Sequence, residues 1–182
     1  KTKEKRQYET RTILWTAGVE AVPFAEALAT ALGVKQVGGG RIEVEADLTV
    51  PGHPNVYVVG DLMSRDKLAG VAEVAMQGGR HAGARIAATV ENGVPSRKPF
   101  KYRDLGTAAY ISRRHALLQA GPVQLSGFIG WVSWGIIHIA FLAGFRNRAS
   151  TVLNWGATLA SKTRRERAIT YGDPETARQP YN

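Results

Sequence analysis

Asp61 is the first candidate for chemistry because it follows a run of four apolar residues, Val56 to Val59, in the sequence VYVVGD. Consecutive apolar positions are typical of a strand covered on both faces, as in a parallel sheet. An Asp after a strand more often caps the following turn than binds a ligand, so Asp61 alone indicates little. The order of motifs indicates more: a strand ending in TAG (residues 16–18), a strand ending in GD, and a helix opening with GVAEVAMQGG (residues 70–79).

Several other kinds of reactive site are excluded by composition. The sequence has no cysteine, which excludes disulfides, thiolate metal sites and cysteine nucleophiles and fits a reducing compartment. His53, His81 and His115 show no metal-ligand spacing and are interpreted as structural. We therefore expect no metal site, and we assign no catalytic side chain.

The elements that must position this carboxylate indicate an α/β fold. Residues 11–18 (RTILWTAG) have the β-branched and aromatic bias of a buried strand, and residues 23–33 form a short helix with Pro near its first turn and Gly at its end. Glycines 38–40 and the sequence PGHPN (residues 51–55) indicate turns, with extended chain between them. Residues 71–92 have a helical pattern, and its glycines predict close packing against another element.

A basic linker over residues 93–104 separates this part from the rest of the chain. The sequences LGTAAYIS and RHALLQAG predict two short strands, joined in a hairpin around Arg113 and Arg114. An uncharged stretch extends from Ala116 to Phe145, and ASTVLNWGATLASK (residues 149–162) predicts a second helix.

The net positive charge comes from the second half of the chain. Residues 1–93 contain 11 Lys and Arg and 11 Asp and Glu, whereas residues 94–182 contain 13 and 4, which accounts for the whole net charge of +9. An anionic partner is therefore expected to bind the second half. The basic residues flank an apolar, Trp-containing helix and form no interleaved groove, so we expect an anionic lipid surface and no nucleic acid.

Residues 125–145 (LSGFIGWVSWGIIHIAFLAGF) could form a helix of roughly 31 Å, about the thickness of a hydrocarbon core. Basic clusters precede and follow this stretch, and a single crossing would place them on opposite sides, against the usual cytoplasmic bias. We therefore interpret residues 123–167 as a monotopic pair of membrane-binding helices; a buried core or dimer interface and a true span are the alternatives. The expected membrane-binding residues are Trp131, Trp134, Trp155, Arg146, Arg148, Lys162, Arg164, Arg165 and Arg167.

The motifs, taken in order, resemble the carboxyl-terminal part of type II NADH dehydrogenases, the flavoprotein NADH:quinone oxidoreductases of the two-dinucleotide-binding-domain family. The resemblance is carried by TILWTAGV (12–19), PGHPNVYVVGD (51–61), GVAEVAMQGG (70–79), YRDLGTAAYIS (102–112) and the helix pair ending in Asn154-Trp155. It implies an α/β fold in which the carboxyl-terminal portion of an FAD-binding Rossmann-like domain precedes a small β element and two amphipathic membrane-binding helices. The corresponding ranges are 1–93, 94–122 for linker and β element, 123–170, and a flexible tail at 171–182.

The resemblance also implies site residues. Asp61 would accept a hydrogen bond from the ribityl hydroxyl of FAD, and the start of the following helix would direct backbone N–H groups at the pyrimidine edge of the flavin. The implied cofactor-binding residues are Gly60, Asp61, Ala72, Glu73 and Val74. The implied quinone-site residues are Ala75, Met76, Gln77 and His138; for His138, a structural role within an interfacial helix is the alternative.

Two features depart from the family. Relatives usually have Gln at the position of Glu73, and an ionised Glu73 beside a reduced, anionic flavin would be repelled, so this side chain should be turned away, paired or protonated. The sequence also contains no GxGxxG loop, whereas the family has two in the preceding part of its chain. We therefore expect a piece of a longer protein that is inactive alone, with the NADH domain outside these residues.

The function implied for the intact protein is NADH:quinone oxidoreduction with FAD as cofactor, by a peripheral homodimer on the cytoplasmic face of the cell membrane. Because of Glu73, the main alternative function is that of a related flavin oxidoreductase with a non-quinone acceptor. A noncatalytic membrane-binding or dimerisation module is the alternative for the isolated piece.

Overall fold

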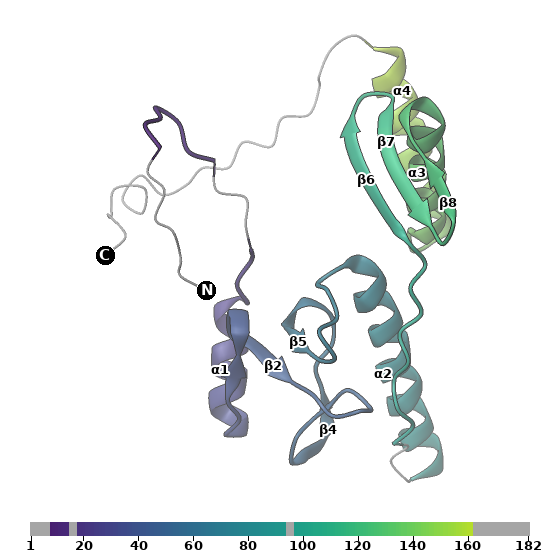
Figure 1. Cartoon of the computed structure of the whole chain (residues 1–182). Helices are drawn as coiled ribbons and strands as arrows, with labels where there is room; N and C mark the ends of the chain where they lie inside the picture. The colour runs from purple at the N-terminus through teal and green to yellow at the C-terminus, as the bar shows by residue number, and fades with distance from the viewer. Residues whose placement is uncertain (1–7, 15–17, 94–96, 162–182) are drawn as a thin grey trace. The chain divides into compact units, whose positions relative to one another are not determined.

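Residues 8–14, 18–93 and 97–161 are described by a computed structural model of the chain, shown in Figure 1. The chain divides into two compact units, residues 1–104 and residues 105–182. This division lies within the range 94–122 that the sequence assigns to a linker and a small β element. Each unit is described by itself below.

The described residues of unit 1 contain two α-helices and two small sheets. In the first sheet, β1 pairs antiparallel with β2, and β2 pairs parallel with β5. In the second, β3 and β4 form an antiparallel pair. The elements are α1 (Pro23–Leu32), β1 (Gln36–Val37), η1 (Gly38–Gly40), β2 (Arg41–Glu43), β3 (Thr49–Val50), β4 (His53–Tyr57), η2 (Gly60–Leu62), β5 (Met63–Ser64) and α2 (Ala72–Asn92).

Both predicted helices of unit 1 are confirmed. Pro23 begins α1, and Gly33 ends it in the left-handed conformation (φ 65°) with its N–H bonded to carbonyls of the last turn. The helix predicted over residues 71–92 is α2. The close packing predicted for the glycines of this helix is confirmed at Gly78, where a Cβ would lie 3.5 Å from the Cβ of Val59. It is wrong for Gly79, where a Cβ would meet nothing within 4 Å.

The strand predictions of unit 1 are partly wrong. Of the strand predicted over residues 11–18, residues 11–14 form no strand, and Ile13 and Leu14 are exposed; residues 15–17 lie outside the described residues. Strand β4 starts at His53, inside the predicted PGHPN turn, and pairs antiparallel and not parallel. Pro54 is tolerated there because β4 has one neighbour, and the register pairs His53 and Tyr57 with β3.

The core of unit 1 joins the sheets to α2. Phe100, from the segment that returns along α2 after its carboxyl end, completes this core and donates its backbone N–H to the Ala46 carbonyl at 2.8 Å. Fully burying one large apolar side chain, such as Leu or Phe, stabilises a fold by about 1.5–3 kcal/mol. The buried cluster consists of Ala29, Ile42, Val44, Leu48, Val50, Val58, Met63, Val74 and Phe100.

In unit 2, residues 105–161 form a three-stranded antiparallel sheet with helix α3 packed against it, followed by helix α4 (Figure 1). The predicted hairpin is confirmed: β6 and β7 pair around a turn at Arg113 and Arg114, with Arg114 left-handed (φ 68°). The elements are β6 (Thr107–Ser112), β7 (His115–Ala120), β8 (Val123–Leu125), α3 (Gly127–Phe141) and α4 (Phe145–Ala160).

The uncharged stretch of the sequence is divided among several elements of unit 2. Residues 123–125 are strand β8, so the helix pair begins at Gly127 and not at residue 123. Helix α4 begins at Phe145, four residues before the predicted start. The amphipathic pattern is clear in α4, whereas α3 has no charged side chain and is apolar on nearly every side. Within the described ranges, no helix is both long enough and apolar enough to cross a membrane.

Candidate functional site

Asp61 lies in η2, directly beside the amino-terminal part of α2. A Cβ added to Gly60 would lie 3.4 Å from the Cβ of Ala75, so the turn and the helix are in close contact. Gly60 has a φ of 69°, a conformation that glycine adopts without strain. This turn leaves the Asp61 carboxylate exposed at the amino-terminal end of α2, where a ligand can reach it.

Gly70 completes the surroundings of this carboxylate. A Cβ at Gly70 would lie 3.2 Å from Oδ1 of Asp61 and 3.3 Å from Nη2 of Arg41, so the ends of both side chains lie close to this glycine and a larger residue would displace them slightly. The sequence reasoning missed Gly70 and Arg41 as site residues. The motif GVAEVAMQGG, which begins at Gly70, could have indicated that this glycine belongs to the site. No sequence pattern singled out Arg41.

The amino-terminal end of α2 is the second part of the site. Val71 precedes the helix in extended conformation and provides no side-chain cap, and the N–H of Ala75 donates to the Val71 carbonyl at 3.2 Å. An α-helix leaves the N–H groups before this bond without partners inside the helix. Together with the helix dipole they favour an electron-rich ligand at residues 72–74.

Glu73 is paired, one of the three outcomes expected for it. The Tyr102 hydroxyl donates a hydrogen bond to Oε2 of Glu73 at 3.2 Å. Burial raises the pKa of Tyr102 above its usual value, and the hydrogen bond to Glu73 and the charges of Glu73 and Asp104 raise it further. Tyr102 therefore stays protonated, as a donor, through the neutral pH range. Sequence reasoning gave Tyr102 no role, although it begins one of the quoted motifs.

Gln77, one turn after Glu73, is held by the same returning segment. Its side-chain N–H donates to the Arg103 carbonyl at 2.8 Å, and its oxygen accepts the Arg103 backbone N–H at 3.0 Å. The side chains of Ala75, Met76 and Gln77 are half-buried. Gln77 thus has a structural task, and a quinone role for these three residues stays a prediction.

The remaining histidines have structural surroundings. His81 packs edge-on against Phe100 with ring centroids 5.5 Å apart, and burial lowers its pKa, with the positive charge of Arg85 adding to this effect. His53 Nε2 lies 2.8 Å from the Leu32 carbonyl. The described part of the chain has no group of three His, Cys, Asp or Glu side chains that could hold a metal ion.

In unit 2, the tryptophans pack against one another as well as facing outward. Trp134 stacks on Trp155 (centroids 5.6 Å apart, planes within 9°) and contacts Tyr110 at 5.2 Å, which joins α3, α4 and the sheet. Trp131 stacks on Phe128. His138 lies 4.3 Å from the Trp134 ring, and its Nδ1 is 2.7 Å from the Trp134 carbonyl. This exposed histidine therefore has a local structural role, and its quinone role stays a prediction.

Large apolar side chains nevertheless remain exposed on both helices. Ile136 is 63% exposed on α3, and Phe145 is 86% exposed at the start of α4. Arg146 and Arg148 lie in the first turn of α4, and Nε of Arg148 donates to the Leu142 carbonyl at the end of α3. The other predicted basic residues, Lys162, Arg164, Arg165 and Arg167, lie outside the described residues. The large exposed side chains of the helices are Phe128, Ile129, Val132, Ile136, Phe141, Phe145, Val152, Leu153, Trp155 and Leu159.

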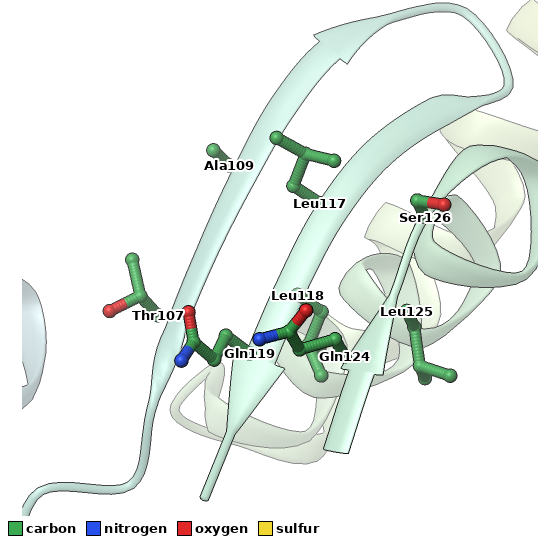
Figure 2. Close-up of a pocket in the computed structure, with 8 residues that line it drawn as sticks. All are labelled: Thr107, Ala109, Leu117, Leu118, Gln119, Gln124, Leu125 and Ser126. Atoms are coloured by element: carbon green, nitrogen blue, oxygen red, sulfur yellow. The ribbon is translucent and has the colours of Figure 1, made fainter. Parts of the chain in front are cut away.

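A pocket of about 480 Å³ on the sheet of unit 2 is a separate feature. In Figure 2 the helices lie behind the sheet, and residues of β6, β7 and β8 surround the opening. It is lined by Thr107, Ala109, Leu117, Leu118, Gln119, Gln124, Leu125 and Ser126. No lining residue is titratable, so the pocket offers no acid, base or charged ligand, and we assign it no chemistry.

Comparison with known proteins places these features in a wider context. Residues 1–82 match the family described as pyridine nucleotide-disulphide oxidoreductase. The chain is 39% identical over 166 residues to the type II NADH:quinone oxidoreductase Ndh of Mycobacterium tuberculosis and 40% identical over 169 residues to NdhA of the same organism. Each alignment covers 91% of this chain and 36% of the relative.

A more distant relative comes from a plant. The internal alternative NAD(P)H-ubiquinone oxidoreductase A1 of Solanum tuberosum mitochondria is 27% identical over 168 residues, which is 81% of this chain and 33% of the relative. The chain therefore spans about a third of the length of the curated relatives it matches.

Proposed function

We propose that this chain, which resembles the carboxyl-terminal part of type II NADH dehydrogenases, forms the flavin-side portion of an enzyme that oxidises NADH and reduces a quinone. The observation that most directly supports this proposal is that the ends of the Asp61 and Arg41 side chains both lie close to Gly70. These residues lie beside the amino-terminal end of α2, which has no side-chain cap. The named relatives are quinone oxidoreductases that use NADH or NAD(P)H. They support this reading for the whole protein, of which these residues would be a part.

The residues of this site fit a flavin cofactor. Gly70 leaves space next to an exposed carboxylate, and an uncapped helix end lies beside it. Asp61 would accept a hydrogen bond from a ribityl hydroxyl, and the backbone amides of residues 72–74 would bind the electron-rich pyrimidine edge of the flavin. FAD, when bound, supplies the capacity to accept electrons as a hydride from NADH and to release them to an acceptor.

We further propose that α3 and α4 bind the surface of an anionic membrane, on the cytoplasmic side. Exposed apolar side chains on these helices, with arginines in the first turn of α4, support this reading. Quinones dissolve in lipid, so a peripheral enzyme of this kind gains access to its acceptor. We include a homodimer in the proposal on the resemblance alone.

Flavin binding is tested on the full-length protein with two carboxylates five residues apart, Asp61 and Asp66. A hydrogen bond to a charged group contributes about 1 kcal/mol more than a neutral one, so Asp61→Asn should raise the flavin dissociation constant about fivefold. Asp66→Asn is the matched control, since Asp66 is exposed and paired with Arg65 at 3.0 Å. Reconstitution of apoprotein followed by flavin fluorescence measures both. A colourless wild-type protein would refute the flavin proposal.

The acceptor needs its own experiment because Glu73 departs from the family. Turnover with NADH and a water-soluble quinone should be fast and should saturate with quinone. If quinone leaves the rate of NADH oxidation unchanged while another acceptor is reduced quickly, the enzyme is the related flavin oxidoreductase and not a quinone reductase.

Membrane binding is tested by flotation with vesicles that contain anionic lipid. Ile136 of α3 and Ile86 of α2 are exposed isoleucines on helices of different units, 63% and 49% exposed. Ile136→Asp should remove most of the vesicle-bound fraction, because a charge in the apolar surface opposes insertion. Ile86→Asp should bind like wild type. Equal binding of both variants would contradict the assignment to α3.

A further inference from the structure

The returning segment, residues 97–104, makes a series of contacts along α2. Phe100 contacts His81, Arg103 is bonded to Gln77, and Tyr102 is bonded to Glu73. The segment is itself anchored, since Phe100 is in the core of unit 1 and Tyr102 packs against it. Glu73 and Gln77 are four residues apart and share one side of the helix. This side of the first two turns of α2 is therefore fixed by contacts from a single segment.

Glu73 stands in the first turn of α2, where the proposed flavin edge would lie. Its charge is of the wrong sign there, because reducing a flavin adds negative charge and a nearby carboxylate opposes it. The Tyr102 hydroxyl gives this carboxylate a hydrogen-bonding partner on the side of the returning segment. A hydrogen bond of this kind to a charged acceptor contributes more than one between neutral groups, and it restricts the rotamers of the side chain.

We propose that Tyr102 is a positioning residue that holds the carboxylate of Glu73 against the returning segment and so keeps its charge from lowering the reduction potential of the flavin. This inference rests on the proposed function, since it assumes a flavin at the amino-terminal end of α2. It assigns a task to a residue outside the turn and helix that carry the site. It also explains how the chain accommodates an acid where the resemblance implies a glutamine.

The test is a double-mutant cycle on the full-length, flavin-loaded protein, with the midpoint potential measured by spectroelectrochemistry. Tyr102→Phe should lower the potential, because the carboxylate loses the hydrogen bond that directs it toward the returning segment. Glu73→Gln should leave the potential near that of wild type, and the double variant should match Glu73→Gln. Tyr57→Phe, which removes the hydroxyl of the second tyrosine packed against this core, is the control and should change nothing.

A second variant covers the case in which Tyr102→Phe does not fold. Glu73→Asp shortens the side chain by one methylene, so the carboxylate can no longer reach the Tyr102 hydroxyl, and the potential should fall as in Tyr102→Phe. Equal potentials for Glu73→Asp and Glu73→Gln would overturn the proposal. So would a double variant with a potential as low as that of Tyr102→Phe. A wild-type protein without flavin would instead refute the proposed function, so the two failures are distinguishable.

Discussion

The two units of this chain use their apolar side chains in opposite ways. Unit 1 buries a continuous cluster between its sheets, α1 and α2, with Ile42 and Leu48 fully inaccessible. Unit 2 buries few residues, Ala116 and Leu118 among them, and leaves many large side chains of α3 and α4 exposed. The net charge is weighted toward unit 2, because residues 105–182 contain 9 Lys and Arg against 3 Asp and Glu, whereas residues 1–104 contain 15 against 12.

This difference fits the two proposed tasks. A ligand site needs atoms held in fixed positions, and unit 1 has a packed core and contacts from the returning segment that would hold them. A surface that binds lipid needs apolar side chains that are not already buried, together with nearby positive charge. Composition alone does not reveal this division, since apolar residues are common in both units.

The largest expected effect compares one isoleucine from each unit. Ile42→Ala should lower the free energy of unfolding by about 2–5 kcal/mol, because it leaves a cavity in a close-packed core. Ile136→Ala should change it by no more than about 0.5 kcal/mol, because the side chain is 63% exposed. Urea unfolding measures both. Similar losses for the two variants would show that α3 is covered in solution and would break the comparison.

A glycine of α3 tests whether unit 2 has any tightly packed contact. A Cβ at Gly130 would lie 2.5 Å from the Ala116 carbonyl oxygen, so Gly130→Ala should destabilise unit 2 by about 1–3 kcal/mol. Gly135→Ala is the control in the same helix, since its Cβ would lie 3.7 Å from the Trp155 ring. In thermal unfolding, the Tm of Gly130→Ala should be below that of wild type, and the Tm of Gly135→Ala should be equal to or above it. The reverse order would place the contact between α3 and the sheet in doubt.

A glycine of α2 gives a smaller effect of opposite sign. Gly79 has no atom within 4 Å of its would-be Cβ, so Gly79→Ala should stabilise the helix by about 1 kcal/mol through helix propensity alone. Flavin binding should not change, because Gly79 lies two turns from the amino-terminal end of α2. A gain in the free energy of unfolding, measured with denaturant at an unchanged m-value, would confirm this prediction. A loss of stability would show that this face of α2 is covered.

The smallest expected effect is a pH dependence in unit 1. The pKa of His81 is lowered in the folded state by burial and by the charge of Arg85, whereas a backbone hydrogen bond at Lys98 and the charge of Asp47 oppose this effect. The unfolded chain therefore takes up the proton first as pH falls below about 6.5. Stability from the neutral imidazole is present above that pH and is lost below it. Wild type should lose more unfolding free energy between pH 7 and pH 5 than His81→Gln does; parallel curves would exclude the effect.

Local signals decided the helices and the hairpin. Pro23 and Gly33 bound α1 as predicted, and Arg113 and Arg114 form the turn between β6 and β7. These features depend on residues close together in the chain, so the sequence specifies them without knowledge of the rest. The charge asymmetry and the ordered motifs are also properties of the sequence itself, and the comparisons bear out the resemblance that the motifs indicated.

Only the tertiary structure decided which apolar runs are paired and which polar groups meet. Residues 11–14 have the composition of a strand, yet pairing needs a neighbour that composition cannot name. Tyr102 and Glu73 are 29 residues apart, and the meeting of Arg41, Asp61 and Gly70 likewise joins three separate segments. Side-chain periodicity shows which face of an element is apolar. It carries no information on which distant group will lie opposite that face, because this depends on the packing of the whole unit.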